Sequence, residues 1–304
     1  MVILKERYSG NTQGMIYMLL AAFCFSVSGA STKVLGNHIN SVELVLFRNI
    51  IGVIFVFSSI FKKPLNSTGG KSNVLVFRGV IGTLALYTFF YAITKIGLAE
   101  AITYQQSYPI FLAIMGVIFL KEIPGKLVWL AIIIGFLGIC LIFLPQFNIG
   151  LLTLKFHAFG ISNAIMTAMA YMSIKQLAGY YDSRTIVLSF MLSGIFLPLI
   201  SLLLGHFIEP GGFEFIIAKF DVPRSGDWLW IMVLAVSALF GQIALTKAFT
   251  LGDSGEVSAI GYFNILFSVW FGVLVGDAIP GLTGFLGMVL IILSGVLISF
   301  SKKS

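Results

Sequence analysis

The sequence predicts an all-α integral membrane protein whose ten transmembrane helices form two inverted five-helix repeats, residues 1–150 and 151–304. Three observations favour this fold class: the composition, ten apolar stretches of similar length, and an internal repeat. Hydrophobic residues make up 58% of the 304 residues and charged residues only 10%, whereas a soluble domain carries about 25% charged residues. The composition therefore excludes an ordinary soluble protein.

Each apolar stretch is long enough to cross a hydrocarbon core of about 30 Å as a helix. Short polar or Gly/Pro segments such as "KKPLNSTGGKSN" and "GDAIPG" separate the stretches and leave no room for a soluble domain. The expected spans cover residues 14–34, 41–60, 73–95, 98–119, 125–144, 154–178, 184–207, 226–249, 254–275 and 281–300.

The basic residues predict the orientation of these spans. If the spans alternate in direction, most Lys and Arg residues fall on the side of the amino terminus, and three fall in the opposite loops, namely Lys155, Lys219 and Arg224. The positive-inside rule then places both termini in the cytoplasm. The net charge of +7 is a topology signal, because the basic residues are scattered over membrane edges. No nucleic-acid partner is expected.

An internal repeat relates the two halves of the chain. A shift of 142 residues pairs Ser31 with Ser173, Lys33 with Lys175 and Gly52 with Gly194. A shift of 156 residues pairs Glu100 with Glu256, Phe111 with Phe267 and Pro124 with Pro280. Since five spans are an odd number, the second half enters the membrane from the opposite side. Alternating-access carriers use such inverted halves, which rock around a site near the midplane.

The stretch "AITKIGLAEAITYQQSYPIFLAIMGVIFLKEIPGKLVWLAIIIGFLGICLI" combines an Ala-rich helix entry, a Pro within a helix, an acidic residue and a Gly-spaced last helix. These features fall at Ala92, Pro109, Phe111, Glu122, Gly135 and Gly138. The pattern resembles the EamA-type unit of the drug/metabolite transporter superfamily. The second copy departs from it with Asn264 near the Pro position and Asp277 in place of the Glu. The resemblance covers essentially the whole chain, but it leaves the substrate open because the superfamily carries many kinds of metabolite.

The resemblance implies a secondary active transporter of the bacterial inner membrane. It would move small organic metabolites, such as amino acids or related zwitterionic compounds, by alternating access. A carrier for uptake of S-adenosylmethionine or a nucleotide-type metabolite is the alternative, and a non-transporting membrane scaffold or sensor is a third. No phosphate-binding loop and no nucleophile beside a base occur, so neither an ATP-driven pump nor an enzyme is expected. We expect no cofactor and no metal site. The expected partners are the substrate, the lipid bilayer and a proton or exchange substrate, with the chain a monomer or weak homodimer.

The segment "TYQQSYPIF", residues 103–111, places polar side chains in the middle of the fourth span. At about 100° per residue, Tyr104, Gln105 and Tyr108 fall on one helix face. The repeat lays Tyr108 on Asn264 of the ninth span. We therefore expect these four residues to bind substrate at the midplane. The alternative is a polar seam that only joins helices.

A cation inside a span must face protein or water. Arg48 lies about seven residues into the second span, on the order of 10 Å deep. It is expected either to bind an anion or carboxylate of the substrate or to pair with Glu43 or Glu100. Arg78 lies nearer the end of its span, where a long side chain is expected to extend to the membrane surface.

Four further ionisable residues are candidates for gating or coupling. Lys33 and Lys175 close matching spans at opposite faces, as topology anchors or as gate residues. Glu100 and Glu256 begin matching helices, where the helix dipole favours a carboxylate. Capping of the helix is one role for these two, and proton coupling is the other.

Overall fold

The fold is described by a computed structural model over residues 2–62, 69–120, 125–143, 151–252, 257 and 260–301. Within these ranges the regular structure is helical and contains no strand, which confirms the predicted fold class. The helices are α1 (Val2–Leu35), α2 (Ser41–Lys62), α3 (Ser72–Ile96), α4 (Leu98–Gln105), α5 (Tyr108–Leu120), α6 (Lys126–Phe143), α7 (Leu151–Leu177), α8 (Ser183–Phe207), α9 (Asp227–Leu251), α11 (Phe263–Leu274) and α12 (Leu282–Ser301).

Several helices have the length and composition of membrane spans. In the described part of the chain, five segments meet both conditions: Thr12–Leu35, Ser41–Lys62, Ser72–Ile96, Ser183–Phe207 and Asp227–Leu251. Shorter apolar helices cover Trp129–Ile142, Phe263–Leu274 and Leu282–Leu297. The chain is therefore a membrane protein, and the count of ten spans stays a prediction.

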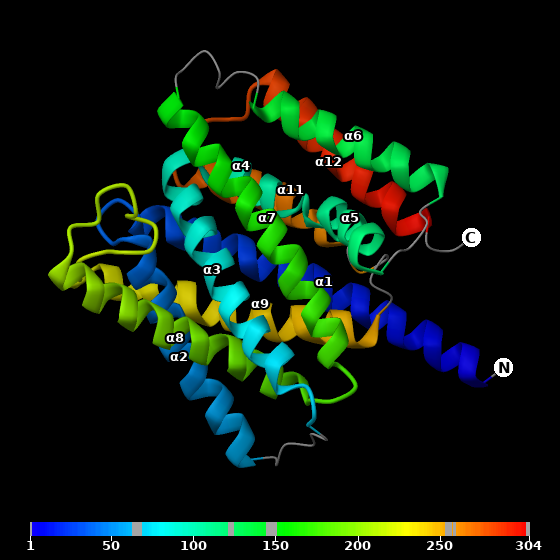
Figure 1. Cartoon of the computed structure of the whole chain (residues 1–304), viewed down its shortest axis with the longest axis horizontal. Coiled ribbons are helices and arrows are strands. Elements are labelled where there is room, and N and C mark those ends of the chain that lie inside the picture. The colour runs from blue at the N-terminus through cyan, green and yellow to red at the C-terminus, as the bar shows by residue number, and fades with distance from the viewer. Residues whose placement is uncertain are drawn as a thin grey trace.

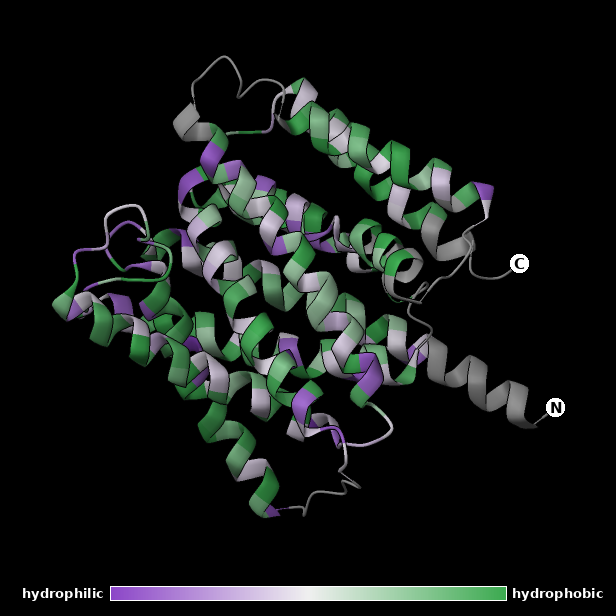
Figure 2. Ribbon diagram, in the orientation of Figure 1, coloured by the Kyte–Doolittle hydropathy of each residue, from purple (hydrophilic) through white to green (hydrophobic). Residues whose placement is uncertain are grey.

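The outer surface of the bundle is apolar. Phe61 is 86% exposed, and Phe207 and Leu282 are both 75% exposed. Figure 2 shows hydrophobic residues along much of α8, α6 and α12. Monomeric soluble proteins rarely expose continuous apolar patches of more than a few hundred Å². These side chains suit contact with lipid tails.

The packing of the helices follows the two-fold pattern that the repeat predicts. Helix α1 packs against α9, and its counterpart α7 packs against α3. Helix α3 also contacts α8, as its counterpart α9 contacts α2. Two further pairs, α2 with α8 and α6 with α12, join an element to its own counterpart, and α6 and α12 run side by side at one edge of the molecule (Figure 1). Two related halves therefore build the fold, while the boundary at residue 150 stays a prediction.

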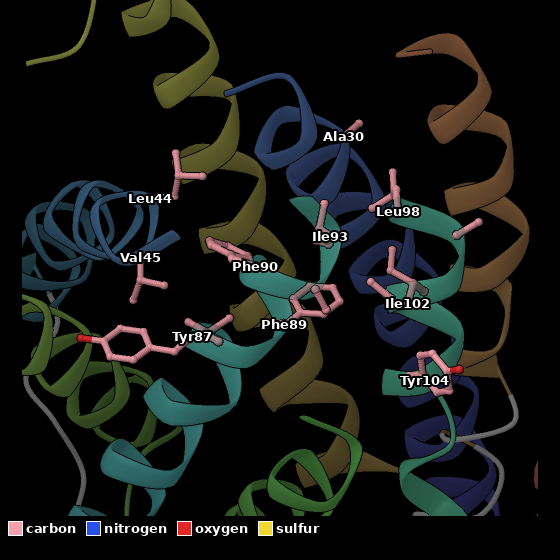
Figure 3. Packing of buried hydrophobic residues seen from close by; sticks show 14 of the residues in the cluster. Ala30, Leu44, Val45, Tyr87, Phe89, Phe90, Ile93, Leu98, Ile102 and Tyr104 are labelled. Atoms are coloured by element: carbon pink, nitrogen blue, oxygen red, sulfur yellow. The ribbon is translucent and has the colours of Figure 1, made fainter. Parts of the chain in front are cut away.

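The buried core joins both halves. Helices α3 and α4 contribute large apolar side chains to it, including Phe90, Ile93, Leu98 and Ile102 (Figure 3). Tyr87 of α3 also lies in this core, and its hydroxyl is 3.0 Å from the Ser201 hydroxyl of α8. The core thus fixes the position of the α3–α4 junction against the second half.

The fourth expected span, residues 98–119, is not one continuous helix. Helix α4 ends at Gln105, and α5 begins at Tyr108 after a two-residue turn. Pro109 explains the break, since proline has no backbone N–H to bond to the carbonyl of residue 105. Within the turn, the backbone N–H and the hydroxyl of Ser107 both donate to the carbonyl oxygen of Tyr104, at 3.0 and 2.6 Å.

The second half has a matching interruption, and the two meet inside the bundle. Tyr262 lies in a turn directly before α11. The side-chain amide of Gln106 donates to the carbonyl oxygen of Gly261, across the interface between the halves. Ser26 of α1 donates to the side-chain oxygen of Asn264 at 2.6 Å. Irregular backbone at membrane depth is tolerated where protein satisfies its polar groups, so the halves stabilise each other's breaks.

Candidate functional site

A cavity of about 60 Å³ lies at the centre of the bundle. Its walls come from α1, α2, α3, α4, α7, α8 and α9, and therefore from both halves of the chain. The largest polar side chains in its walls are Arg48, Arg78, Gln105, Asn163, Tyr171 and Gln242. Aromatic residues such as Phe25 and Phe190 form much of the remainder. Among the described residues of its lining there is no carboxylate.

Two arginines give the central cavity its charge. Arg48 of α2 is 5% exposed and Arg78 of α3 is 2% exposed. The central guanidinium carbons of Arg48 and Arg78 lie 5.4 and 4.5 Å from the centre of the same Phe190 ring. Within the described residues neither guanidinium has a carboxylate partner, and Arg48 Nη1 and Arg78 Nε are buried without a hydrogen bond.

A glycine makes room for this arrangement. Gly82 lies one helical turn after Arg78 and also lines the cavity. A Cβ atom at this position would overlap the Arg78 guanidinium and would lie 2.8 Å from the Phe190 ring. The Arg78 guanidinium can therefore lie between α3 and the Phe190 ring because residue 82 has no side chain.

A smaller hollow of about 20 Å³ lies beside the central cavity. The two share Phe25, Gln105 and Tyr171 as lining residues. Tyr108 and Asn264 line the smaller hollow, and the Tyr108 and Tyr171 rings meet edge to face at 4.9 Å. The interrupted segments of both halves therefore reach the wall of the central cavity.

The structure brings together four of the five residues expected to bind substrate. Arg48 and Gln105 line the central cavity, and Tyr108 and Asn264 line the adjoining hollow. Tyr104 lies apart from both. It is fully buried in the apolar core, and its hydroxyl is 2.8 Å from Nδ1 of His157. The expected shared face fails for Tyr104 because it assumed a continuous helix, whereas α4 ends at Gln105 and the turn before Tyr108 changes the direction of the chain.

Arg48 does not pair with Glu43 or with Glu100, the two acidic residues that the sequence offered as partners. Glu43 accepts hydrogen bonds from the Asn40 side chain and from the backbone N–H of Asp221. Glu100 lies beside Asp277 in a separate cavity. Neither carboxylate therefore pairs with Arg48.

A second polar cluster lies where α3 joins α4. Lys33 Nζ is 3.1 Å from Asp277 Oδ1, and the other Asp277 oxygen accepts the backbone N–H of Leu98 at 2.8 Å. Lys33, Glu100 and Asp277 line a cavity of about 410 Å³ there. Gly97 links the two helices with φ +99°, a conformation that favours glycine. Asp277, the acidic residue of the second copy, thus ties α11–α12 to the first half.

The other two gating candidates lie elsewhere. Lys175 is exposed in the last turn of α7. Glu256 and also Glu122, the acidic residue of the first copy, lie outside the described residues.

Sequence reasoning missed several residues of the central cavity. Arg78 was expected to extend to the membrane surface, yet it is buried at the cavity. The repeat held a signal for Phe190, since the shift of 142 lays this residue on Arg48. Gln242 and Asn163 are amides within apolar helices, the same kind of signal that singled out Gln105.

Two related sets of apolar helices that enclose a buried polar cavity define the class of a membrane carrier. The comparison with protein families agrees with this class. The model of the EamA-like transporter family matches residues 12–144 and again residues 154–300. The chain belongs to the EamA-like transporter family, as the sequence resemblance predicted. The family consists of transporters, which confirms the prediction that the chain is not an enzyme.

Three curated relatives are similar over nearly their whole length. An uncharacterized transporter of Helicobacter pylori is 32% identical, with 94% of each chain covered. The pseudopaline exporter CntI of Pseudomonas aeruginosa is 28% identical, over 95% of this chain and 97% of the exporter. The S-adenosylmethionine uptake transporter of Rickettsia prowazekii is 24% identical, over 95% of this chain and 93% of that protein.

Cysteine labelling checks which residues face the central cavity. In a background with Cys24 and Cys140 replaced by alanine, we expect small charged thiosulfonates to modify S28C and Q105C, because both positions line the cavity. Y104C is the matched control and should resist labelling, since Tyr104 is enclosed by the core. Equal labelling at 104 and 105, or no labelling at 28 and 105, would contradict the placement.

Proposed function

We propose that this protein is a secondary active transporter of small organic metabolites, which it moves across a bacterial inner membrane by alternating access. The observation that carries the proposal is the buried polar cavity formed by helices of both halves. Its volume of about 60 Å³ is well below the ~300–1,000 Å³ of sites that hold a small molecule. Substrate therefore enters when the halves move apart, as rocking around a central site requires.

The proposed binding residues line the central cavity and the adjoining hollow. Arg48 and Gln105 act at the centre, and Tyr108 and Asn264 act from the interrupted segments. Tyr104 supports the site from behind, through its bond to His157.

The Lys33–Asp277 pair is the proposed latch at the outer end of the molecule. It holds the loop before α12 to the α3–α4 junction, where Gly97 supplies a flexible link. Glu100 lies beside the pair. In the sequence repeat, Lys175 is the counterpart of Lys33 and Glu256 is the counterpart of Glu100. The inverted repeat would put these counterparts on the cytoplasmic side, together with both termini.

The polar lining fits a hydrophilic substrate, and the family resemblance favours an amino acid or a related metabolite. S-adenosylmethionine or a nucleotide-type compound is the alternative. One relative is named for export and another for uptake, so the direction of transport does not carry over. A proton or a second metabolite exchanged in return is the proposed source of energy, and the proposed unit is a monomer or weak homodimer.

Uptake from a mixture of metabolites tests this function, because the substrate does not have to be known in advance. Proteoliposomes that contain the protein are incubated with a bacterial metabolite extract, and the captured compounds are identified by mass spectrometry. We expect one compound or one chemical family to accumulate beyond the level in empty liposomes. R48A should remove that accumulation while the protein still elutes as a single species, because Arg48 lines the cavity.

Identical profiles with and without protein would support the scaffold or sensor instead. Normal accumulation by R48A would move the binding site away from the central cavity.

The latch is tested by the rate at which S28C is labelled from outside. D277N removes one charge of a partly exposed pair, which is worth roughly 0.2–1 kcal/mol. We expect labelling to accelerate up to about fivefold. K33Q should act alike, and the double variant should add nothing further, because both changes break one interaction. K219Q is the control, since Lys219 pairs with Glu209 at the surface.

Additive effects of D277N and K33Q, or an equal effect of K219Q, would contradict the latch.

A further inference from the structure

We infer that the substrate is a small organic anion with two negative groups, and that Arg48 and Arg78 together bind these groups in the central cavity. This inference rests on the proposed function and specifies the substrate class of the same site. It differs from the zwitterionic substrate that the sequence alone suggests.

The first argument is the missing countercharge. Buried cations require a partner, because the protein interior does not replace the hydration that they lose. Among the described residues, no carboxylate within the bundle pairs with either guanidinium, and Glu100 lines a separate cavity. Glu43 bonds to Asn40 and Asp221, Asp277 pairs with Lys33, and Asp227 lies 2.6 Å from His38. The two guanidiniums are therefore left for a ligand.

The second argument is the position of Phe190. Its ring attracts both guanidiniums through its π system, and this contact keeps the two side chains near the same ring at the cavity. An aromatic ring has no net charge, so Phe190 does not neutralise either guanidinium. Both arginines keep their positive charge. Repulsion between them falls when an anion binds to each, which favours a dianion over a singly charged ligand.

The third argument is the chemistry of the other walls. Gln105, Tyr171 and Gln242 offer amide and hydroxyl donors to oxygen atoms of an anion. The described lining contains no carboxylate to pair with the positive group of a zwitterionic amino acid or a sulfonium compound, whereas it contains two arginines for negative groups. Asn163 presents a buried side-chain oxygen without a partner, which suits a hydroxyl group of the ligand.

Binding to purified protein in detergent tests the inference. The probes are dicarboxylates from malonate to adipate, glycerol phosphate as an organophosphate, butyrate as a monocarboxylate, and alanine and S-adenosylmethionine. We expect saturable thermal stabilisation by at least one dianion, weaker at high ionic strength, and none by alanine or S-adenosylmethionine. The dicarboxylate and organophosphate arms show which anionic group the arginines prefer.

Variants assign the binding to the two arginines. R48Q and R78Q should each weaken binding of the dianion by roughly tenfold or more, as loss of a charged hydrogen bond predicts. R78K keeps the charge but not the planar fork of donors, so its loss should be smaller. R224Q removes an exposed arginine and should leave binding unchanged.

Stabilisation by alanine or S-adenosylmethionine equal to that by every dianion would overturn the inference. Unchanged dianion affinity in both R48Q and R78Q would do so too. The metabolite-extract experiment separates this failure from that of the proposed function. Selective uptake of a neutral or zwitterionic compound there would retain the transporter and reject the dianion, whereas no uptake at all would reject the transporter.

Discussion

The interior of this protein is governed by one constraint: within an apolar bundle in lipid, each polar group must find its partner inside the protein. The described structure meets it at the places where the helices are interrupted. Gln106 satisfies the carbonyl of Gly261, and Ser26 bonds to Asn264. These bonds cross between the halves, so the breaks that would weaken either half alone join the two. The two-fold packing of α1 on α9 and α7 on α3 holds these interrupted segments at the centre.

The two arginines are buried charges to which the described residues supply no countercharge. Arg48 and Arg78 are buried against Phe190 without a carboxylate, although several acidic residues are available within the bundle and bind elsewhere. Selection for stability alone would pair these cations or replace them with apolar residues, because isolated buried charge is costly. A site that must release its ligand on each side of the membrane has a different requirement, since its countercharge has to leave with the substrate.

Composition, span length and the repeat were enough to predict the fold, because lipid imposes strong rules on a chain. Arg48 and Gln105 could be identified as polar residues at depth in apolar helices. Tyr104 was assigned to the wrong helix face because the prediction assumed one continuous helix. The chain changes direction after Gln105, so the faces of α4 and α5 do not line up. Arg78 was missed because its side chain lies along α3 against Gly82 and does not extend to the membrane surface. The Lys33–Asp277 pair joins residues 244 positions apart, and a single sequence carries no sign of that contact.

The central claim is that the cavity lined by Arg48 and Arg78 is an anion site. Crystals of the protein soaked in bromide, with diffraction measured at the bromine absorption edge, test it most directly because the anomalous signal locates the anion. We expect a peak within hydrogen-bond distance of the Arg48 or Arg78 guanidinium, and its loss from R48Q crystals treated alike. Bromide found only at surface lysines, with the cavity free of anomalous signal, would contradict the account.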